Sequence, residues 1–380
     1  MAGIYIHIPF CRQACTYCNF HFSTNIRQKK QLLDALKEEI VLTDKSNEAA
    51  TLIETIYIGG GTPSLLSPNE IDEILQTIKQ HFFIRKDAEI TLEANPDDIS
   101  IEILESWKKM GINRLSLGIQ SFNSAELLWM NRAHNAEQSL QSINEIIKTG
   151  FTNFSVDLIY GSPLLSNDDF IKNVQTVLNK NIPHVSAYAL TVEPKTALHA
   201  QINKKKLAPV DEARQAEQFD ILVTMMEAAG YEQYEISNFA KPGFRSRHNS
   251  SYWQGRAYYG FGPAAHSFNG NNIRRWNIAN NALYIKSIAQ QIIPFEEEKL
   301  TLTQQLNERI MISLRTLEGL DLNKVAIDFD KIYADQILTS AQSYVNNKKL
   351  VLTEGRLVLT KEGRFFADGI ASDLFFDSLN

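Results

Sequence analysis

The chain has 380 residues and a formal net charge of −6, with 44% hydrophobic and 22% charged residues. These values are typical of a soluble globular protein with one large and one smaller domain. The acidic balance argues against a general nucleic-acid binder, which needs a basic surface, and no apolar run is long enough to predict a transmembrane helix.

Strands and helices are predicted to alternate through the first 240 residues. An apolar run predicts the first strand over residues 4–10, and a helix with one apolar side follows over residues 28–43. Further strands are predicted over residues 55–58, 89–92, 114–117, 154–159 and 185–190, with a weaker one at 233–236, and helices over 68–81, 101–110, 136–149 and 168–178. This alternation indicates βα units around a parallel sheet.

The first strand leads into a loop that holds Cys11, Cys15 and Cys18, the only cysteines of the chain. Three thiols cannot form a complete set of disulfides. A structural zinc ion normally takes four protein ligands, and His21 would then be the fourth. Closely spaced thiolates favour an iron–sulfur cluster, and a 4Fe–4S cluster on three cysteines leaves one iron free for a small molecule.

Polar or glycine-rich positions lie in or directly after six successive predicted strands, after the first four and within the last two. Functional groups of βα barrels gather at the C-terminal ends of the strands, so these positions predict one common site. They are the cysteine loop, residues 59–63 (Gly-Gly-Gly-Thr-Pro), Glu93, Gln120, Asp157 and Tyr188. Each also has a plainer interpretation, because glycine runs mark ordinary tight turns and glutamates usually lie on the surface.

The spacing C-x3-C-x2-C, with an aromatic residue before the last cysteine, resembles the signature of the radical S-adenosylmethionine (SAM) superfamily. The resemblance implies an incomplete (β/α)6 TIM-like barrel whose cluster is held by Cys11, Cys15 and Cys18. It also implies that SAM binds the open iron and that an electron from the cluster cleaves it to methionine and a 5′-deoxyadenosyl radical. The residues implied to hold SAM are Tyr5, Tyr17, Gly60, Gly61, Thr62, Glu93, Gln120, Arg132 and Asp157.

A longer set of motifs resembles the HemN/HemW family, which comprises oxygen-independent coproporphyrinogen III oxidase and a related haem chaperone. The motifs are H-I-P-F-C, Y-I-G-G-G-T-P-S, L-E-A-N-P, R-L-S-L-G-I-Q-S-F and V-D-L-I-Y-G, between His7 and Gly161. The oxidase usually has a further cysteine where this chain has Phe20, and it has a longer extension before the cluster loop. Both departures favour the chaperone branch.

Residues 248–253, His-Asn-Ser-Ser-Tyr-Trp, match the H-N-x-x-Y-W motif of that branch. A histidine can bind haem iron and the aromatic residues can stack on a flat macrocycle. From chemistry alone a packed, hydrogen-bonded corner is an equally good interpretation of His248. His266 is a competing candidate for the haem ligand.

Beyond Glu296, helices are predicted over residues 302–314 and near 335–345, followed by a hairpin that turns at Glu354 and Gly355. This pattern predicts a small helical, winged-helix-like C-terminal domain, without the basic helix that a DNA reader would need. The expected division is a core barrel over residues 1–237, a connecting segment over 238–295 and the C-terminal domain over 296–380.

The resemblance implies a haem chaperone that binds haem, a 4Fe–4S cluster and SAM and transfers haem to acceptor haemoproteins, without dehydrogenase activity. The alternative is an oxygen-independent coproporphyrinogen III dehydrogenase, which decarboxylates its substrate to protoporphyrinogen IX. A zinc-stabilised binding module is a third hypothesis. Reduced thiols and the lack of a leader predict a cytoplasmic protein. An electron donor for the cluster, peripheral contact with a membrane and a homodimer are further expectations.

Overall fold

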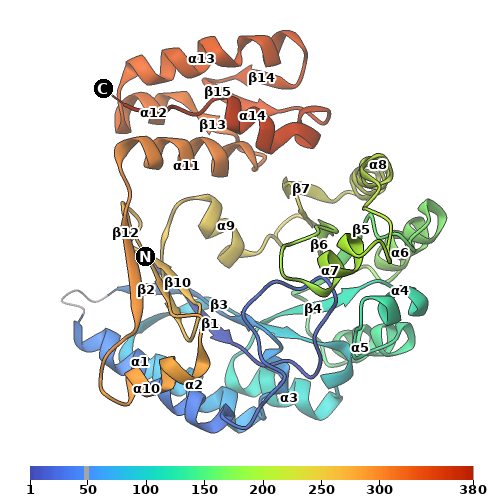
Figure 1. The fold of residues 1–380 in the computed structure, drawn as a ribbon, viewed down its shortest axis with the longest axis vertical. Helices are drawn as coiled ribbons and strands as arrows, with labels where there is room; N and C mark the ends of the chain where they lie inside the picture. The colour runs from blue at the N-terminus through green and yellow to red at the C-terminus, as the bar shows by residue number, and fades with distance from the viewer. Residues whose placement is uncertain (47–50, 380) are drawn as a thin grey trace.

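Six parallel strands in chain order form the centre of the structure, a computed structural model that describes residues 1–46 and 51–379 (Figure 1). These strands are β1 (Ala2–Ile8), β2 (Leu52–Gly60), β3 (Phe83–Ala94), β4 (Arg114–Gln120), β5 (Phe154–Tyr160) and β6 (His184–Ala189). Strand β6 pairs with β8 (Asn238–Ala240) rather than with β1, so the sheet stays open. This arrangement confirms the predicted incomplete barrel.

Helices between the strands cover the outer face of the sheet, where Figure 1 shows α1, α2, α3 and α5 side by side. They are α1 (Lys29–Ser46), α2 (Pro68–His81), α3 (Ile101–Met110), α4 (Ser124–Trp129), α5 (Ala136–Lys148) and α6 (Asn167–Asn179). Helix α2 shows how local sequence signals determine where a helix begins and which side is buried. Ser67 and Glu70 form a capping box around Pro68, and the apolar side from Ile71 to Ile78 is buried against the sheet.

The segment after β6 extends the sheet at both edges. Helices α7 (Ala197–Asn203) and α8 (Glu212–Ala228) precede β7 (Glu232–Glu235), which pairs with β8. Strand β9 (Ala257–Phe261) runs parallel to β1, and β10 (His266–Phe268), β11 (Ile273–Asn277) and β12 (Phe295–Lys299) continue antiparallel. Helices α9 (Arg247–Trp253) and α10 (Asn281–Ile288) also belong to this segment. The residues expected to connect two domains therefore also build part of the sheet.

The C-terminal residues form a separate helical body with its own apolar core above α9 (Figure 1). It contains α11 (Leu302–Leu314), β13 (Leu320–Asp321), α12 (Leu322–Asp328), α13 (Lys331–Asn346), β14 (Leu350–Thr353), β15 (Arg356–Leu359), a short 3-10 turn η3 (Gly363–Phe366) and α14 (Ala367–Asp373). The hairpin turns at Glu354 and Gly355, whose φ angles of 50° and 75° suit a two-residue type I′ turn. Among the helices of the described ranges, none has both the length and the apolar character needed to cross a bilayer.

Candidate cofactor site and a second cavity

A first cavity of about 1010 Å³ opens at the C-terminal ends of the parallel strands. Every residue that the sequence predicts for the cluster or for SAM lines it, and so does Tyr188. These residues are Tyr5, Cys11, Cys15, Tyr17, Cys18, Gly60, Gly61, Thr62, Glu93, Gln120, Arg132 and Asp157. The open barrel thus brings together residues from five strands and the loops that follow them, while their individual roles stay predictions.

The glycine segment after β2 holds the cysteine loop in place. The backbone N–H of Gly61 donates to the carbonyl of Ile8 at 2.8 Å, and that of Thr62 donates to the carbonyl of Phe10 at 2.7 Å. A Cβ atom on Gly61 would lie 2.6 Å from the carbonyl oxygen of Phe10, so only glycine permits this close approach. The position of Cys11 at the cavity wall is therefore set by backbone contacts with the next strand.

The three thiols are free and half-buried on one loop. Within residues 1–46 and 51–379, no three His, Cys, Asp or Glu side chains converge on a point that could hold a single metal ion. A four-iron cluster has a different requirement, since each thiolate bonds a different iron atom. Burial raises the pKa of Cys11 to about 11 and also raises the pKa of Cys18. Cluster binding would therefore release protons from these thiols.

Arg132 connects the cysteine loop to the strand ends. Its Nη1 donates to Sγ of Cys15 at 3.4 Å, and its Nη2 donates to Oδ1 of Asn95 at 2.8 Å and to the carbonyl of Gly118 at 2.7 Å. Its buried Nε has no partner among the described residues. An unpaired buried donor at the wall of a cavity fits a bound acceptor group, because leaving it unpaired is costly.

Two half-buried carboxyl groups lie at the same wall. Glu93 accepts hydrogen bonds from the Tyr57 hydroxyl at 2.7 Å and from the backbone N–H of Gly60 at 3.0 Å. Burial raises the pKa of Glu93 to about 7 despite these donors, and burial raises the pKa of Asp157 to about 6. A cationic ligand would favour the ionised form of both groups. SAM carries a sulfonium, an ammonium group and ribose hydroxyls, so the pair fits that ligand.

Gln120 is the last residue of β4, and its backbone has an unusual conformation. Its φ of 68° lies in the left-handed region, where a residue other than glycine is strained, and the β4–β5 register shifts between Leu117 and Gln120. Such irregularities at a strand end redirect a side chain and cluster at functional sites. The strain agrees with the predicted role of Gln120 at the cavity.

The sequence did not predict the part of the cavity wall that the C-terminal domain supplies. Arg315, just after α11, and the run Arg364, Phe365 and Phe366 line the first cavity together with Gln215 of α8. The two phenylalanines are 41% and 52% exposed. The adjacent pair Phe365 and Phe366 is visible in the sequence. No pattern there indicates that it lies beside strands more than 170 residues earlier.

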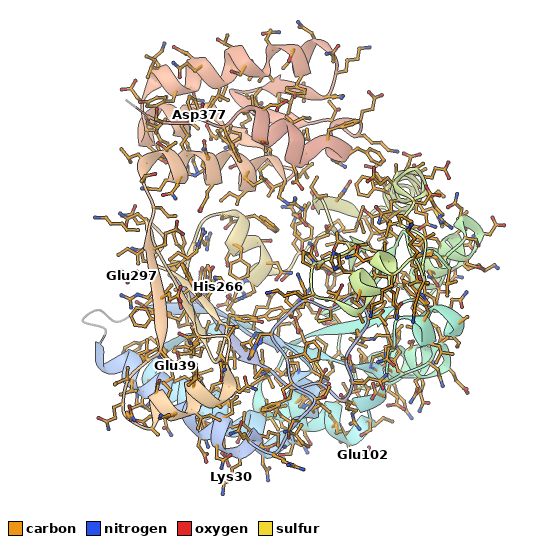
Figure 2. All side chains as sticks on the ribbon, viewed as in Figure 1. Lys30, Glu39, Glu102, His266, Glu297 and Asp377 are labelled. Carbon is orange, nitrogen blue, oxygen red and sulfur yellow. The ribbon has the colours of Figure 1, made fainter. Side chains whose placement is uncertain are left out.

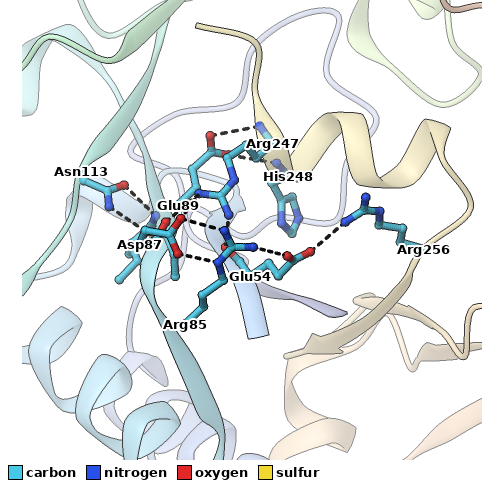
Figure 3. A network of polar contacts seen from close by, with 10 residues as sticks. Glu54, Arg85, Asp87, Glu89, Asn113, Arg247, His248 and Arg256 are labelled. Atoms are coloured by element: carbon cyan, nitrogen blue, oxygen red, sulfur yellow. Dashed lines mark hydrogen bonds and ion pairs between the residues drawn. The ribbon is translucent and has the colours of Figure 1, made fainter. Parts of the chain in front are cut away.

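His248 lies at the start of α9 and is 1% exposed. Its Nδ1 is hydrogen-bonded to the Thr55 hydroxyl and its Nε2 to the Tyr252 hydroxyl, both at 2.8 Å. Figure 3 shows the backbone N–H groups of Arg247 and His248 donating to the two oxygens of Glu89, at 3.0 and 2.9 Å. Burial lowers the pKa of His248 to about 3, so the ring is neutral. The motif histidine forms a packed corner and lines neither cavity.

A second cavity of about 890 Å³ lies between the barrel, α9 and the C-terminal helices. It is lined by Tyr252 of the motif, by Tyr258 of β9, and by His266 and Phe268 of β10. Figure 2 shows His266 in this region, between the strands and the C-terminal domain. Tyr5 of β1 and Asn19 and Phe20, just after the last cysteine, line both cavities and therefore form a wall that the two spaces share.

Comparisons with known proteins agree with this geometry. Residues 5–177 match the family model of the radical SAM superfamily, and residues 300–366 match that of the HemN C-terminal domain. The chain is 34% identical to heme chaperone HemW of Mycobacterium tuberculosis over 98% of this chain and 94% of the relative. It is 33% identical to heme chaperone HemW of Bacillus subtilis, over 97% and 98% of the two chains.

The chain belongs to the HemW family of the radical SAM superfamily. Membership of that superfamily implies a 4Fe–4S cluster and SAM. The solved structure of coproporphyrinogen III oxidase (HemN) from Escherichia coli superposes with a TM-score of 0.84 at 23% identity, covering 98% of this chain and 90% of the other. At that identity the likeness concerns the fold, and it confirms the radical SAM barrel with its helical C-terminal region.

Proposed function

We propose that this HemW-family chain binds haem and transfers it to haem-accepting proteins. The proposal depends above all on one observation, the similarity to heme chaperones HemW along nearly the whole length of both chains. Phe20, at the position where the oxidase usually has a further cysteine, supports the same choice. It is 69% exposed and lines both cavities.

In this proposal the first cavity holds the cofactors. Cys11, Cys15 and Cys18 would bind the cluster, and Glu93 and Asp157 would face the cationic and hydroxyl groups of SAM. When bound, the reduced cluster and SAM can supply a 5′-deoxyadenosyl radical, to which we assign an auxiliary role. Arg132 would keep the Cys15 end of the loop against the strand ends through its contacts with Asn95 and Gly118.

We further infer an electron donor for the cluster and a cytoplasmic location in which the thiols stay reduced. Contact with a membrane surface and a homodimer remain predictions of the sequence. The acceptor is a haemoprotein whose apo form takes haem from this chain.

The test is a haem titration of the anaerobically reconstituted full chain, followed by the Soret band. We expect saturable binding of one haem per chain, transfer to an added apo-haemoprotein, and no release of CO2 from coproporphyrinogen III. A Cys11→Ser, Cys15→Ser, Cys18→Ser triple variant serves as the control for absorption by the cluster. Failure to bind haem saturably would refute the proposal, and decarboxylation of coproporphyrinogen III would establish the oxidase activity instead.

A further inference from the structure

The proposed function leaves open where the haem lies, and the second cavity is the better match. The first cavity already contains the thiols and all the residues predicted for SAM. The second cavity, at about 890 Å³, falls within the roughly 300–1,000 Å³ typical of sites that enclose a small molecule. Its aromatic walls, Tyr252, Tyr258, Phe268 and Phe20, suit the faces of a flat macrocycle.

Three histidines line the second cavity, and they differ in the availability of a ring nitrogen. His7 is 5% exposed, with Nδ1 hydrogen-bonded to the Tyr5 hydroxyl at 3.2 Å and Nε2 to the carbonyl of His21 at 2.9 Å. His21 uses Nε2 to contact Oδ1 of Asn281 at 2.8 Å. Within the part of the chain that the structure describes, neither ring nitrogen of the exposed His266 has a hydrogen-bond partner.

A neighbouring strand orients the His266 ring. It pairs in register with Trp276 across β10 and β11, and their ring centroids lie 6.2 Å apart at an interplanar angle of 30°. An imidazole with an open ring nitrogen at a cavity wall is a group that can bind haem iron.

Arginines at the wall of the same cavity suit the carboxylate side chains of haem. Arg274 pairs with Glu308 at 2.7 Å, Arg309 with Asp328 at 3.1 Å, and Arg256 with Glu54 at 2.8 Å. Each guanidinium group has five N–H donors, so donors remain for a propionate beside the existing ion pair. The cavity thus contains an iron ligand, stacking surfaces and cationic partners.

We propose that haem binds in the second cavity with His266 as the axial iron ligand and His248 as a positioning residue. His248 is hydrogen-bonded to the hydroxyl of Tyr252, whose ring packs edge-on against Tyr258 at a centroid distance of 4.7 Å. Its role is to hold the Tyr252 wall against the macrocycle. The H-N-x-x-Y-W motif then reaches haem through its tyrosine and not through its histidine.

The proposal is tested by titrating ferric haem into the full-length His266→Gly variant, with and without added imidazole. We expect the affinity for haem to fall about tenfold or more, which corresponds to about 1.4 kcal/mol or more. The Soret and low-spin EPR signals should change as well. Added imidazole should restore the signals by replacing the missing ligand, which a merely structural role would not allow. Iron-free protoporphyrin IX should bind the variant as it binds the wild type.

Matched variants complete the experiment. His199→Ala changes a histidine of α7 that lines neither cavity, and it should leave the titration unchanged. His248→Gln should weaken binding of both haem and protoporphyrin IX while the axial-ligand spectrum stays that of the wild type. Loss of that spectrum in His248→Gln or His21→Ala, with retention in His266→Gly, would overturn the assignment. If the wild type itself binds no haem, the proposed function fails and not only the location of the site.

Discussion

Glu93 shows how the properties of a single residue decide what the first cavity can bind. Its carboxyl group is half-buried and accepts hydrogen bonds from the Tyr57 hydroxyl and the Gly60 backbone N–H. Burial raises its pKa to about 7, with Asp157 as a further cause, so near neutral pH the group exchanges a proton. A ligand that donates hydrogen bonds or carries positive charge will bind the ionised form better.

We predict that SAM affinity of the reconstituted protein rises about tenfold between pH 6 and pH 8, because a group of pKa near 7 goes from mostly protonated to mostly ionised over that range. Glu93→Gln should bind SAM more weakly, by about 1.5–3 kcal/mol, and should keep only the about twofold rise that Asp157, with a pKa of about 6, contributes over this range. Equilibrium dialysis at a series of pH values measures both effects. Glu73→Gln, at a glutamate of α2 whose side chain is 62% exposed, is the control. The same pH dependence in wild type and Glu93→Gln would contradict the assignment.

A second prediction concerns the effect of His248 on the pH dependence of stability. Its pKa is lowered to about 3 in the fold, against about 6.5 in an unfolded chain. As the pH falls, the ring is therefore protonated in the unfolded chain before it is protonated in the folded chain. The stabilisation of the fold by the neutral ring is complete above about pH 6.5 and is lost progressively as the pH falls towards about 3. Between pH 7 and pH 5 the wild type should lose about 2 kcal/mol more of its unfolding free energy than His248→Gln. Urea denaturation at the two pH values tests this, and equal losses would show that His248 does not carry the effect.

Among the elements, helix α9 is held to strand β3 by hydrogen bonds from its first turn. The helix has seven residues, too few to be stable alone, and its first N–H groups are satisfied by Ser246 and by the carboxylate of Glu89 (Figure 3). A negative charge at this end also stabilises the helix, because it lies beside the positive end of the helix dipole. The strand thereby fixes the orientation of the H-N-x-x-Y-W motif.

Glu89→Ala should accordingly lower the unfolding free energy by about 2–4 kcal/mol, because it removes the partner of the buried backbone N–H of His248 and of the partly buried N–H of Arg247. Urea denaturation measures the loss. Glu137→Ala offers a matched control, since Glu137 also lies in the first turn of a helix, α5, but is exposed. A loss no larger than that of the control would show that water or another group replaces Glu89.

Local signals explain which elements the sequence could predict. Helices α2, α3 and α11 have the predicted bounds because Ser67, Ser100 and Thr301 cap them and Gly111 ends α3 in the left-handed conformation. Strands β9 to β12 were not predicted. They are short, and β12 is Phe-Glu-Glu-Glu-Lys, a charged edge strand without alternating apolar residues. Helix α8 was also missed: Phe219, Leu222, Val223 and Met226 form its buried face, but Ile221 and Met225 lie outside that face, so the apolar periodicity is weak.

Some residues of the candidate site could be predicted from the sequence and others could not. The residues at the strand ends could be predicted, because parallel strands place their C-terminal ends at one edge and the motifs resemble a known family. Arg364, Phe365 and Phe366 could not be predicted, since their position depends on how the C-terminal domain docks. His266 was only one of two candidates, because the hydrogen bonds that occupy both nitrogens of His248 are tertiary contacts with Thr55 and Tyr252.

At the scale of the whole molecule, Arg315 joins the C-terminal domain to the barrel. Its guanidinium contacts Oε1 of Glu235 at 3.3 Å and Oδ1 of Asp368 at 2.6 Å, and it lies 5.5 Å from the ring centroid of Trp253. Its backbone carbonyl accepts from the N–H of Ile236 at 3.1 Å. One side chain therefore links β7, α9 and α14 beside the first cavity, which Arg315 and Asp368 both line.

Arg315→Met should release this junction, because it removes the cation beside the buried carboxylate of Glu235 while keeping much of the side-chain volume. Breaking a buried ion pair costs about 3–5 kcal/mol, and Arg315 is 21% exposed, so we expect the lower end of that range. Amide hydrogen exchange should become faster in residues 363–373, which close the cavity, and change little in β1 to β6, whose core is separate. Lys331→Met is the control, since it breaks an exposed pair with Asp335 on the same domain. A uniform increase across the barrel would instead mean that docking of the C-terminal domain and folding of the barrel form one cooperative unit.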